Sequence, residues 1–265
     1  MAFVHLHVHS IYSLLDSTCR LEELVSRARQ MGMPALALTD LNALYGAIPF
    51  YDLCRQAGLQ PILGMEARME EGHSLVLLAE DEEGYRNLCR LSTVLQSFSE
   101  PPARLPWAAL RHHSDGLIAL TGGNAGWITS MVRQGEMDRA QRLLGGLLAL
   151  FGRRNVFLEL QVHSPADIPV VERLVALAET AGLSYVATSD VHYLEARDAP
   201  AHLLLASIRT GTHLLQPHLE KPEWGENHHP SFHFCSPEEM AQRFSRWPRA
   251  LANTAYLADR CRLEL

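Results

Sequence analysis

The sequence predicts an α/β protein: a distorted seven-stranded β/α barrel of TIM-like form, followed by a helical C-terminal tail. Three observations predict this class. Short β-rich runs alternate with longer helical patterns, which is typical of a parallel sheet covered by helices. Seven of these runs lie between Phe3 and Ser189, a number that suits a barrel better than an open sheet. A last helical stretch extends from Pro237 to Arg262.

The expected strands are short apolar runs bounded by turn-forming residues. In chain order they are Phe3–Val8, Ala35–Thr39, Pro61–Ala67, Ser74–Ala79, Gly116–Thr121, Val156–Gln161 and Ser184–Ser189. Only the polar stretch from Arg68 to His73 separates the third run from the fourth. So short a connection favours a local hairpin, and the barrel is therefore expected to be irregular.

The expected helices have apolar residues spaced three or four positions apart, as in the run from Leu21 to Ala28. They cover Leu21–Met31, Ala43–Ala57, Glu82–Leu95, Met137–Phe151 and Pro165–Ala181. Glycines suited to a helix C-terminal cap follow three of them, at Gly32, Gly58 and Gly182. Ser164 and Ser236 each precede a first-turn proline and have an acidic residue three positions on, which is the pattern of a capping box.

We expect one domain over residues 1–265, with the barrel over about 1–210, a loop over 211–235 and the helical tail over 236–265. The hydrophobic fraction of 47% and the charged fraction of 20% are those of a globular chain. With 23 Lys+Arg against 30 Asp+Glu, the formal charge is −7. This balance argues against a protein that coats nucleic acid through a basic face.

The five cysteines are scattered and form no C-x-x-C pair, which indicates a reduced, cytoplasmic protein. No apolar run reaches the roughly 18 residues of a membrane helix, and no basic start precedes an apolar stretch. We therefore expect neither a membrane span nor a signal peptide. The 14 histidines are many for a chain of this length, and such an excess points first to bound metal.

Three histidines, His5, His7 and His9, alternate with apolar residues at the start of the chain. Alternation along a strand would put all three on one face, where they would converge inside the barrel. The apolar residues between them would then face the covering helices. The alternative is an edge strand that presents three solvated histidines.

Further candidate ligands fall where expected strands end, and these ends form one rim of a β/α barrel. They are Asp40, Glu66, His163, Asp190 and His192. A mixture of imidazole and carboxylate suits Zn²⁺, Mn²⁺ or Fe rather than Ca²⁺. Since more than four ligands are present, two or three ions become possible, and spaced ions are the usual device for hydrolysing phosphate esters.

The run from His7 to Asp16 resembles the first motif of the polymerase and histidinol phosphatase (PHP) family, and most of all the amino-terminal domain of bacterial DNA polymerase III alpha subunits. Matching runs follow in order at Leu38–Asp40, Leu44–Gly46, Pro61–Glu66, Glu83–Leu88, Leu158–His163 and Thr188–Tyr193. The tail, at Ser236–Met240 and Ala252–Thr254, resembles the stretch where that domain ends and the polymerase palm begins. The resemblance covers nearly the whole chain and implies a distorted seven-stranded β/α barrel.

The resemblance also implies a set of metal ligands: His7, His9, Asp16, Glu66, His163, Asp190 and His192. Asp190, His192 and Glu66 are the expected catalytic residues, the carboxylates by holding ions and a histidine by protonating the leaving oxygen. His5 stands where many family members carry an aspartate. We place His5 and Asp40 behind the ligands rather than among them.

Two departures from the family pattern reduce the expected number of ions. Leu41 follows Asp40 where the family has a histidine, and Phe98–Arg104 offers no histidine where phosphatase relatives have a further ligand. An apolar side chain neither coordinates an ion nor supports a ligand. One to three divalent ions (Zn, Mn or Fe) are possible, and we expect fewer than three, or a vestigial site.

Two functions follow from the resemblance. The first is a metal-dependent phosphoesterase acting on a DNA 3′ end, as a proofreading 3′–5′ exonuclease does, or on a small phosphate ester. The second is a non-catalytic replicase module with a degenerate metal site, which would stabilise the polymerase core or bind a proofreading partner or another replisome subunit. A TIM-barrel amidohydrolase, with a similar H-x-H start and late aspartate, is more distant. The sequence contains no polymerase palm, fingers or thumb, so we do not expect this chain alone to extend DNA.

Overall fold

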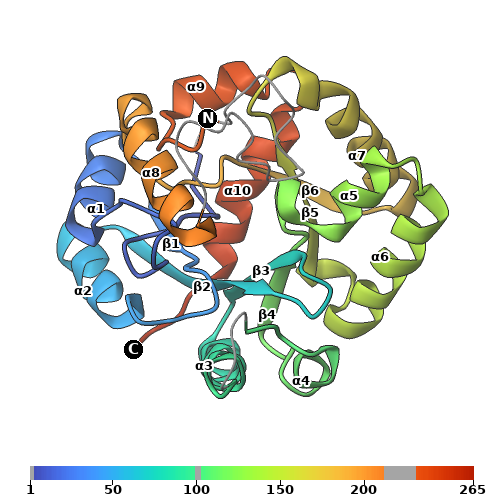
Figure 1. Ribbon diagram of the computed structural model, residues 1–265, viewed down its shortest axis with the longest axis horizontal. Helices are drawn as coiled ribbons and strands as arrows, with labels where there is room; N and C mark the ends of the chain where they lie inside the picture. The colour runs from blue at the N-terminus through green and yellow to red at the C-terminus, as the bar shows by residue number, and fades with distance from the viewer. Residues whose placement is uncertain (1–2, 99–102, 212–230) are drawn as a thin grey trace.

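A computed structural model describes residues 3–98, 103–211 and 231–265, in which six strands form one curled mixed sheet (Figure 1). The strands are β1 (Ala35–Leu38), β2 (Gln60–Arg68), β3 (Ser74–Ala79), β4 (Leu117–Leu120), β5 (Val156–Gln161) and β6 (Ser184–Thr188). Their order in the sheet is their order in the chain. Strand β3 runs antiparallel to both neighbours, whereas the other pairs are parallel. The expected hairpin between the third and fourth runs is therefore confirmed.

The first expected strand, Phe3–Val8, is not a strand in the structure. This segment contacts both β1 and the chain that follows β6, but only Val8 is paired, in an isolated bridge to Val191. The carbonyls of His5 and Val8, three positions apart, accept hydrogen bonds from Ala37 in β1 and from Thr39 directly after it. A parallel ladder uses every second residue, so no regular strand forms here. The described residues thus contain six strands in an incomplete barrel, and the prediction of seven was wrong.

Ten α-helices are present in the described residues. They are α1 (Leu21–Gln30), α2 (Ala47–Ala57), α3 (Glu82–Gln96), α4 (Trp107–His112), α5 (Trp127–Arg133), α6 (Met137–Phe151), α7 (Ile168–Ala181), α8 (Ala199–Thr210), α9 (Pro237–Arg243) and α10 (Pro248–Arg260). The five helices expected before the tail are confirmed, with α2 beginning later than expected. The helical tail is two helices, α9 and α10. Helices α4, α5 and α8 were not predicted.

The expected helix caps are confirmed by backbone geometry. Gly58 and Gly182 end α2 and α7 in the left-handed conformation, with φ of 71° and 63°. Ser164 forms a capping box with Asp167 at a short 3₁₀ turn, Pro165–Asp167, that precedes α7. Ser236 forms a second capping box at the start of α9. These local signals set where the helices around the sheet begin and end.

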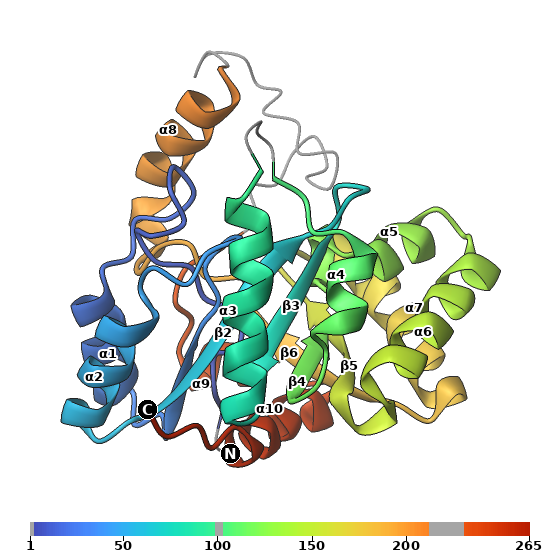
Figure 2. The ribbon, with the colours of Figure 1, turned by 90° about the horizontal axis from the view of Figure 1, so that it is seen from below.

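The sheet has an apolar cluster on each face. The larger cluster joins one face to the helices packed against it. The smaller cluster lies on the inner face and includes Val4, Leu6, Val76, Leu78 and Leu257. Helix α10, which supplies Leu257, lies across the end of the sheet opposite to α8 (Figure 2). Val4 and Leu6 were expected to face outward, and this was wrong because their segment crosses to the inner face instead of following the strand ladder.

Part of the predicted organisation falls outside the described residues. Most of the loop expected over 211–235 does so, and so does the middle of the stretch Phe98–Arg104. Among the residues that are described, no helix is both long enough and apolar enough to cross a membrane.

Candidate metal centre

Four side chains from distant parts of the chain converge where β2 and β6 end: His7, His9, Glu66 and Asp190. Each offers one ligand atom, and the four atoms lie within 4.8 Å of one another. Nε2 of His9 lies 3.1 Å from Oε2 of Glu66 and 3.3 Å from Oδ1 of Asp190. Nε2 of His7 lies 3.5 Å and 3.4 Å from the same two oxygens. Two imidazoles and two carboxylates form a donor set that suits Zn, Mn or Fe.

The ring of His9 is hydrogen-bonded through one nitrogen, while the other nitrogen faces Glu66 and Asp190. Its Nδ1 is 3.0 Å from the hydroxyl of Ser13, which donates to Asp40 at 2.7 Å. Its Nε2 is buried, faces the two carboxylates and has hydrogen-bond geometry to no group in the described residues. Asp40, fully occupied by Ser13 and by two bonds from Ser10, therefore lies behind the cluster.

The ring of His7 is oriented by Glu159, a residue that sequence reasoning did not select. Nδ1 of His7 is 2.7 Å from Oε1 of Glu159, which also accepts from Thr188 at 2.6 Å and from Gln161 at 3.1 Å. Glu159 is completely buried in the middle of β5. Metal-binding histidines usually donate their other ring N–H to such a carboxylate. The available signal was the pair Glu159 and Gln161, which place two polar groups on one face of an otherwise apolar strand.

Asp190 occupies its position through unusual backbone geometry. It follows β6 and has φ of 50°, in the left-handed region that non-glycine residues seldom adopt. Its carboxylate faces His7 and His9, and His192 Nε2 lies 3.1 Å from the same oxygen. Nδ1 of His192 donates to the backbone carbonyl of Asp16 at 2.6 Å. Strained backbone at a cluster of convergent polar groups is common at functional sites.

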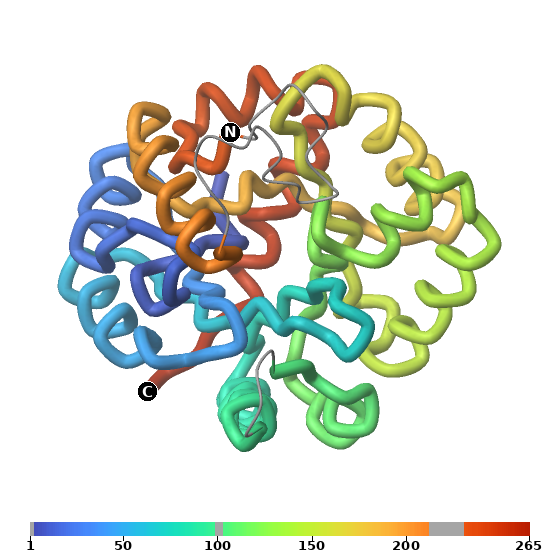
Figure 3. Tube along the Cα trace, in the orientation of Figure 1, coloured from blue at the N-terminus to red at the C-terminus, as the bar shows by residue number. Residues whose placement is uncertain are grey.

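His9, His192 and Asp16 form a second group whose ligand atoms lie within 4.8 Å of one another. The carboxylate of Asp16 is paired with the guanidinium of Arg209, at the end of α8. Helix α8 lies beside the loop that follows His9, although almost 200 residues separate them (Figure 3). A positive charge from this unpredicted helix therefore already occupies one side of the second group.

His163 and His5 are not in either group. Nδ1 of His163 bonds the carbonyl of Ser231 at 3.1 Å, while its Nε2 is buried without a hydrogen-bond partner in the described residues. Both nitrogens of His5 are engaged, by the carbonyl of Cys235 at 2.9 Å and the hydroxyl of Ser189 at 3.2 Å. The expected convergence of His5 with His7 and His9 was wrong, because their segment is not a regular strand.

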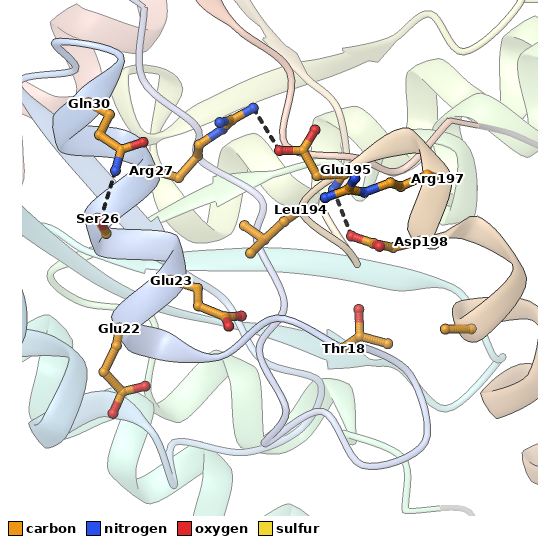
Figure 4. A pocket seen from close by; sticks show the side chains of 11 residues that line it. Thr18, Glu22, Glu23, Ser26, Arg27, Gln30, Leu194, Glu195, Arg197 and Asp198 are labelled. Carbon is orange, nitrogen blue, oxygen red and sulfur yellow. Dashed lines mark hydrogen bonds and ion pairs between the residues drawn. The ribbon is translucent and has the colours of Figure 1, made fainter.

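A hollow of about 640 Å³ lies near the second group, and none of the candidate metal ligands named above lines it. Charged side chains from α1 and from the turn before α8 line it, among them Arg27 and Glu195, which form an ion pair at 2.9 Å (Figure 4). Thr18, also on its lining, donates its backbone N–H to the carbonyl of His192 at 3.0 Å. Its lining has four acidic and two basic side chains, and Arg27 pairs with Glu195.

The histidines His7 and His9 and the carboxylates Glu66 and Asp190 shift one another's pKa values. Burial disfavours charge on His9, yet the nearby carboxylates of Asp190 and Glu66 outweigh it and raise the pKa of His9 to about 9. Glu159 and Asp190 likewise overcome burial and raise the pKa of His7 well above its ordinary value. Burial would raise the pKa values of Glu66 and Asp190, but the histidines hold both well below their usual range. The buried carboxylates thus require positive charge at this point, and a divalent ion would supply it.

The curled α/β sheet, with histidines and carboxylates gathered where its strands end, makes this an α/β domain with a candidate metal centre. The PHP domain family matches residues 5–163, and the chain belongs to this family. It is 40% identical over 280 residues to an error-prone DNA polymerase of Symbiobacterium thermophilum, covering 99% of this chain and 25% of that protein. It is 35% identical over 271 residues to the DNA polymerase III subunit alpha of Bacillus subtilis, covering 100% of this chain and 23% of that protein.

The chain therefore spans about a quarter of the length of these relatives. Among solved structures, a two-domain protein of Bacteroides vulgatus, described as containing a predicted PHP-like metal-dependent phosphoesterase, has a TM-score of 0.46 and 15% identity. The match covers 80% of this chain and 56% of that one.

Proposed function

We propose that this PHP domain is a metal-dependent phosphoesterase of a DNA polymerase III alpha-like protein, acting on a DNA 3′ end as a 3′–5′ exonuclease or on a small phosphate ester. One observation carries the proposal. Four donor atoms, from His7, His9, Glu66 and Asp190, converge within 4.8 Å, and the buried Nε2 of His9 faces both carboxylates without hydrogen-bond geometry to either. A buried nitrogen that lacks an aligned hydrogen bond and faces carboxylates is suited to binding an ion between them.

These four residues would hold the first ion, and Asp16 and His192 would join His9 around a second ion. His163, which lies in neither group, would complete the ligand set only if its side chain moved towards them. Bound divalent ions supply charge for phosphate oxygens and lower the pKa of water. The remaining roles belong to the chain itself. Glu159 fixes the ring of His7, and Ser13 with Asp40 fixes that of His9. With a single ion bound, His192 is the proposed proton donor to the leaving oxygen, because the Asp16 carbonyl holds its Nδ1 and leaves Nε2 facing Asp190.

The second candidate is a non-catalytic replicase module that stabilises a polymerase core or recruits a proofreading partner. The observation that favours it is that the second group, His9, Asp16 and His192, is poorly prepared to bind an ion. Arg209 already pairs with the Asp16 carboxylate, and Leu41 replaces the family's histidine in the turn after Asp40. Fewer than three ions would then bind.

Elemental analysis of the purified chain, together with a nuclease assay, separates the two functions. The phosphoesterase should contain at least one equivalent of Zn, Mn or Fe and should shorten a 3′-labelled oligonucleotide. Asp190→Asn should abolish both properties, whereas Asp138→Asn, at an exposed carboxylate on α6, should change neither. A folded chain without metal and without hydrolysis of DNA or a chromogenic phosphate ester would refute the enzyme and support the replicase module.

A further inference from the structure

Two arginines, Arg68 and Arg104, meet at Gly72 in the turn between β2 and β3. Nη1 of Arg68 donates to the carbonyl of Gly72 at 3.3 Å. Gly72 has φ of 90°, and a Cβ placed on it would lie 3.4 Å from Nη1 of Arg104. The positive φ favours glycine at this turn, and both guanidinium groups lie against its backbone.

The backbones that carry the two arginines are tied together. The N–H of Leu105 donates to the carbonyl of Arg68 at 2.8 Å. Asn42 links the same two segments: its side-chain oxygen accepts from the N–H of Arg68 at 2.8 Å, and its side-chain nitrogen donates to the carbonyl of Ala103 at 3.2 Å. Asn42 has φ of 56°, so the linking residue itself holds a strained conformation. The pair is thus built into the fold rather than formed by two loose surface side chains.

The positive charge of the pair is poorly matched within the described residues. Nη1 of Arg104 is buried and has no hydrogen-bond partner there. Burial, and then repulsion from Arg68, lower the pKa of Arg104. Among the described residues, the carboxylate of Glu66 forms an ion pair with the arginines, 3.9 Å from Nη2 of Arg68, whereas the exposed Glu70 and Glu71 at the tip of the hairpin form none with either arginine. Two like charges held together with spare donors favour an anion between them.

The arginine pair adjoins the candidate metal centre through one side chain. Oε1 of Glu66 is the oxygen near Arg68, and Oε2 of Glu66 is the oxygen 3.1 Å from Nε2 of His9. An anion between the arginines would therefore lie beside the reacting group of a substrate held at the metal centre. Phosphate is the anion that matches planar guanidinium donors and the proposed reaction.

We propose that Arg68 and Arg104 bind a phosphoryl group of the substrate and position it beside Glu66. This inference rests on the proposed function for its role in hydrolysis, but binding of phosphate by the pair can be measured without it. The two sources of the phosphoryl group are a small phosphate ester and the backbone of a DNA strand. Both sources present phosphate oxygens to the arginines, and a comparison of two substrates distinguishes the sources.

The binding test uses inorganic phosphate as the probe, titrated calorimetrically into the chelator-treated chain and into the Mn²⁺-loaded chain. Arg104→Gln and Arg68→Gln should each weaken phosphate binding about tenfold or more, as expected for loss of a charged hydrogen-bond donor. The number of bound Mn²⁺ ions should stay unchanged. Arg111→Gln, at an exposed arginine on α4, is the matched control and should bind phosphate normally. Unchanged phosphate affinity in both variants would overturn the proposal.

The kinetic test compares a chromogenic phosphate ester with a short single-stranded oligonucleotide. A rise in KM for both substrates, with little change in kcat, would place the reacting phosphoryl group at the pair. A rise in KM for the oligonucleotide alone would place a neighbouring backbone phosphate there. Arg104→Lys, which keeps the charge but loses the fork of donors, should be intermediate and serves if the glutamine variant fails to fold. If the parent chain hydrolyses neither substrate, the proposed function fails, and the phosphate titration still decides the role of the pair.

Discussion

The carboxylate of Glu159 accepts a hydrogen bond from Nδ1 of His7 at 2.7 Å, and this contact determines which edge of the His7 ring faces Glu66 and Asp190. Glu159 has no exposed surface, and Thr188 also donates to its carboxylate. The histidine is therefore fixed by a buried negative charge on the opposite side from the candidate ligands. Such support raises the basicity of the ring nitrogen that faces the ion.

Glu159→Gln should weaken metal binding by about 10- to 100-fold, the usual effect of losing a carboxylate behind a ligating histidine. The amide has the shape of the carboxylate, so the fold should persist, but it lacks the charge that supports His7. Competition with a chromophoric chelator measures the affinity. Glu179→Gln, on the exposed face of α7, is the control. Equal affinity in the Glu159 variant and the parent would show that this contact is structural only.

Arg209→Gln should allow the chain to bind one further Mn²⁺ ion. The guanidinium of Arg209 is paired with the carboxylate of Asp16, and its removal frees that carboxylate for an ion beside His9 and His192. Without metal, the variant should lose about 1–3 kcal/mol of stability because a buried charge has lost its partner. Elemental analysis after dialysis against Mn²⁺ counts the ions. An unchanged count in a folded variant would contradict this prediction.

Leu41→His should also raise the metal content and should speed hydrolysis of a phosphate ester. Leu41 follows Asp40, its N–H donates to the hydroxyl of Ser13, and its backbone pairs with that of Glu66. An imidazole at this position would therefore lie at the edge of the candidate metal centre. The cost in stability should be about 1 kcal/mol, because the side chain is only half-buried. Leu44→His, in the same loop, is the control. A folded variant that gains neither metal nor rate would favour the replicase module.

His5 should make the metal-free protein less stable in acid. Burial lowers the pKa of His5 from 6.5 to about 4 in the folded chain. Between these two values the unfolded chain binds a proton that the folded chain does not, so stability falls as the pH drops from 6.5 towards 4. The full effect is about 3 kcal/mol. His5→Asn should show a flatter dependence in urea unfolding between pH 7.5 and 4.5, and parallel curves for the two proteins would contradict the assignment.

The parts of the site that could be predicted from the sequence are those fixed by local position. Glu66 lies near the end of β2 and Asp190 just after β6, and the carboxyl ends of parallel strands meet at one rim when the sheet curls towards a barrel. The spacing of His7 and His9 likewise favoured a shared ion. The orientation of His5 could not be predicted, since strand alternation fails in a segment whose hydrogen bonds are irregular.

The residues that sequence reasoning missed depend on contacts between distant segments. Glu159 lies inside an apolar run, and its buried carboxylate is accounted for by contacts with distant residues, above all His7, 152 positions away, and Thr188. Arg209 contacts Asp16 across 193 positions through a helix with weak sequence signals. Arg68 and Arg104 are brought together by the turn at Gly72 and by the side chain of Asn42, and no sequence motif marks either feature.

The position of α10 has a consequence for the order of events during synthesis. The N–H of Val4 donates to the hydroxyl of Thr254 at 3.1 Å, across 250 positions, and the side chain of Gln60 donates to the carbonyl of Cys261 at 2.7 Å. A ribosome that has translated only the six strands therefore holds a nascent chain whose inner apolar face is still open to water. Contacts so far apart in sequence form slowly, and partly closed intermediates of this kind tend to aggregate. The inner face of this domain can therefore close only after α10 has left the exit tunnel.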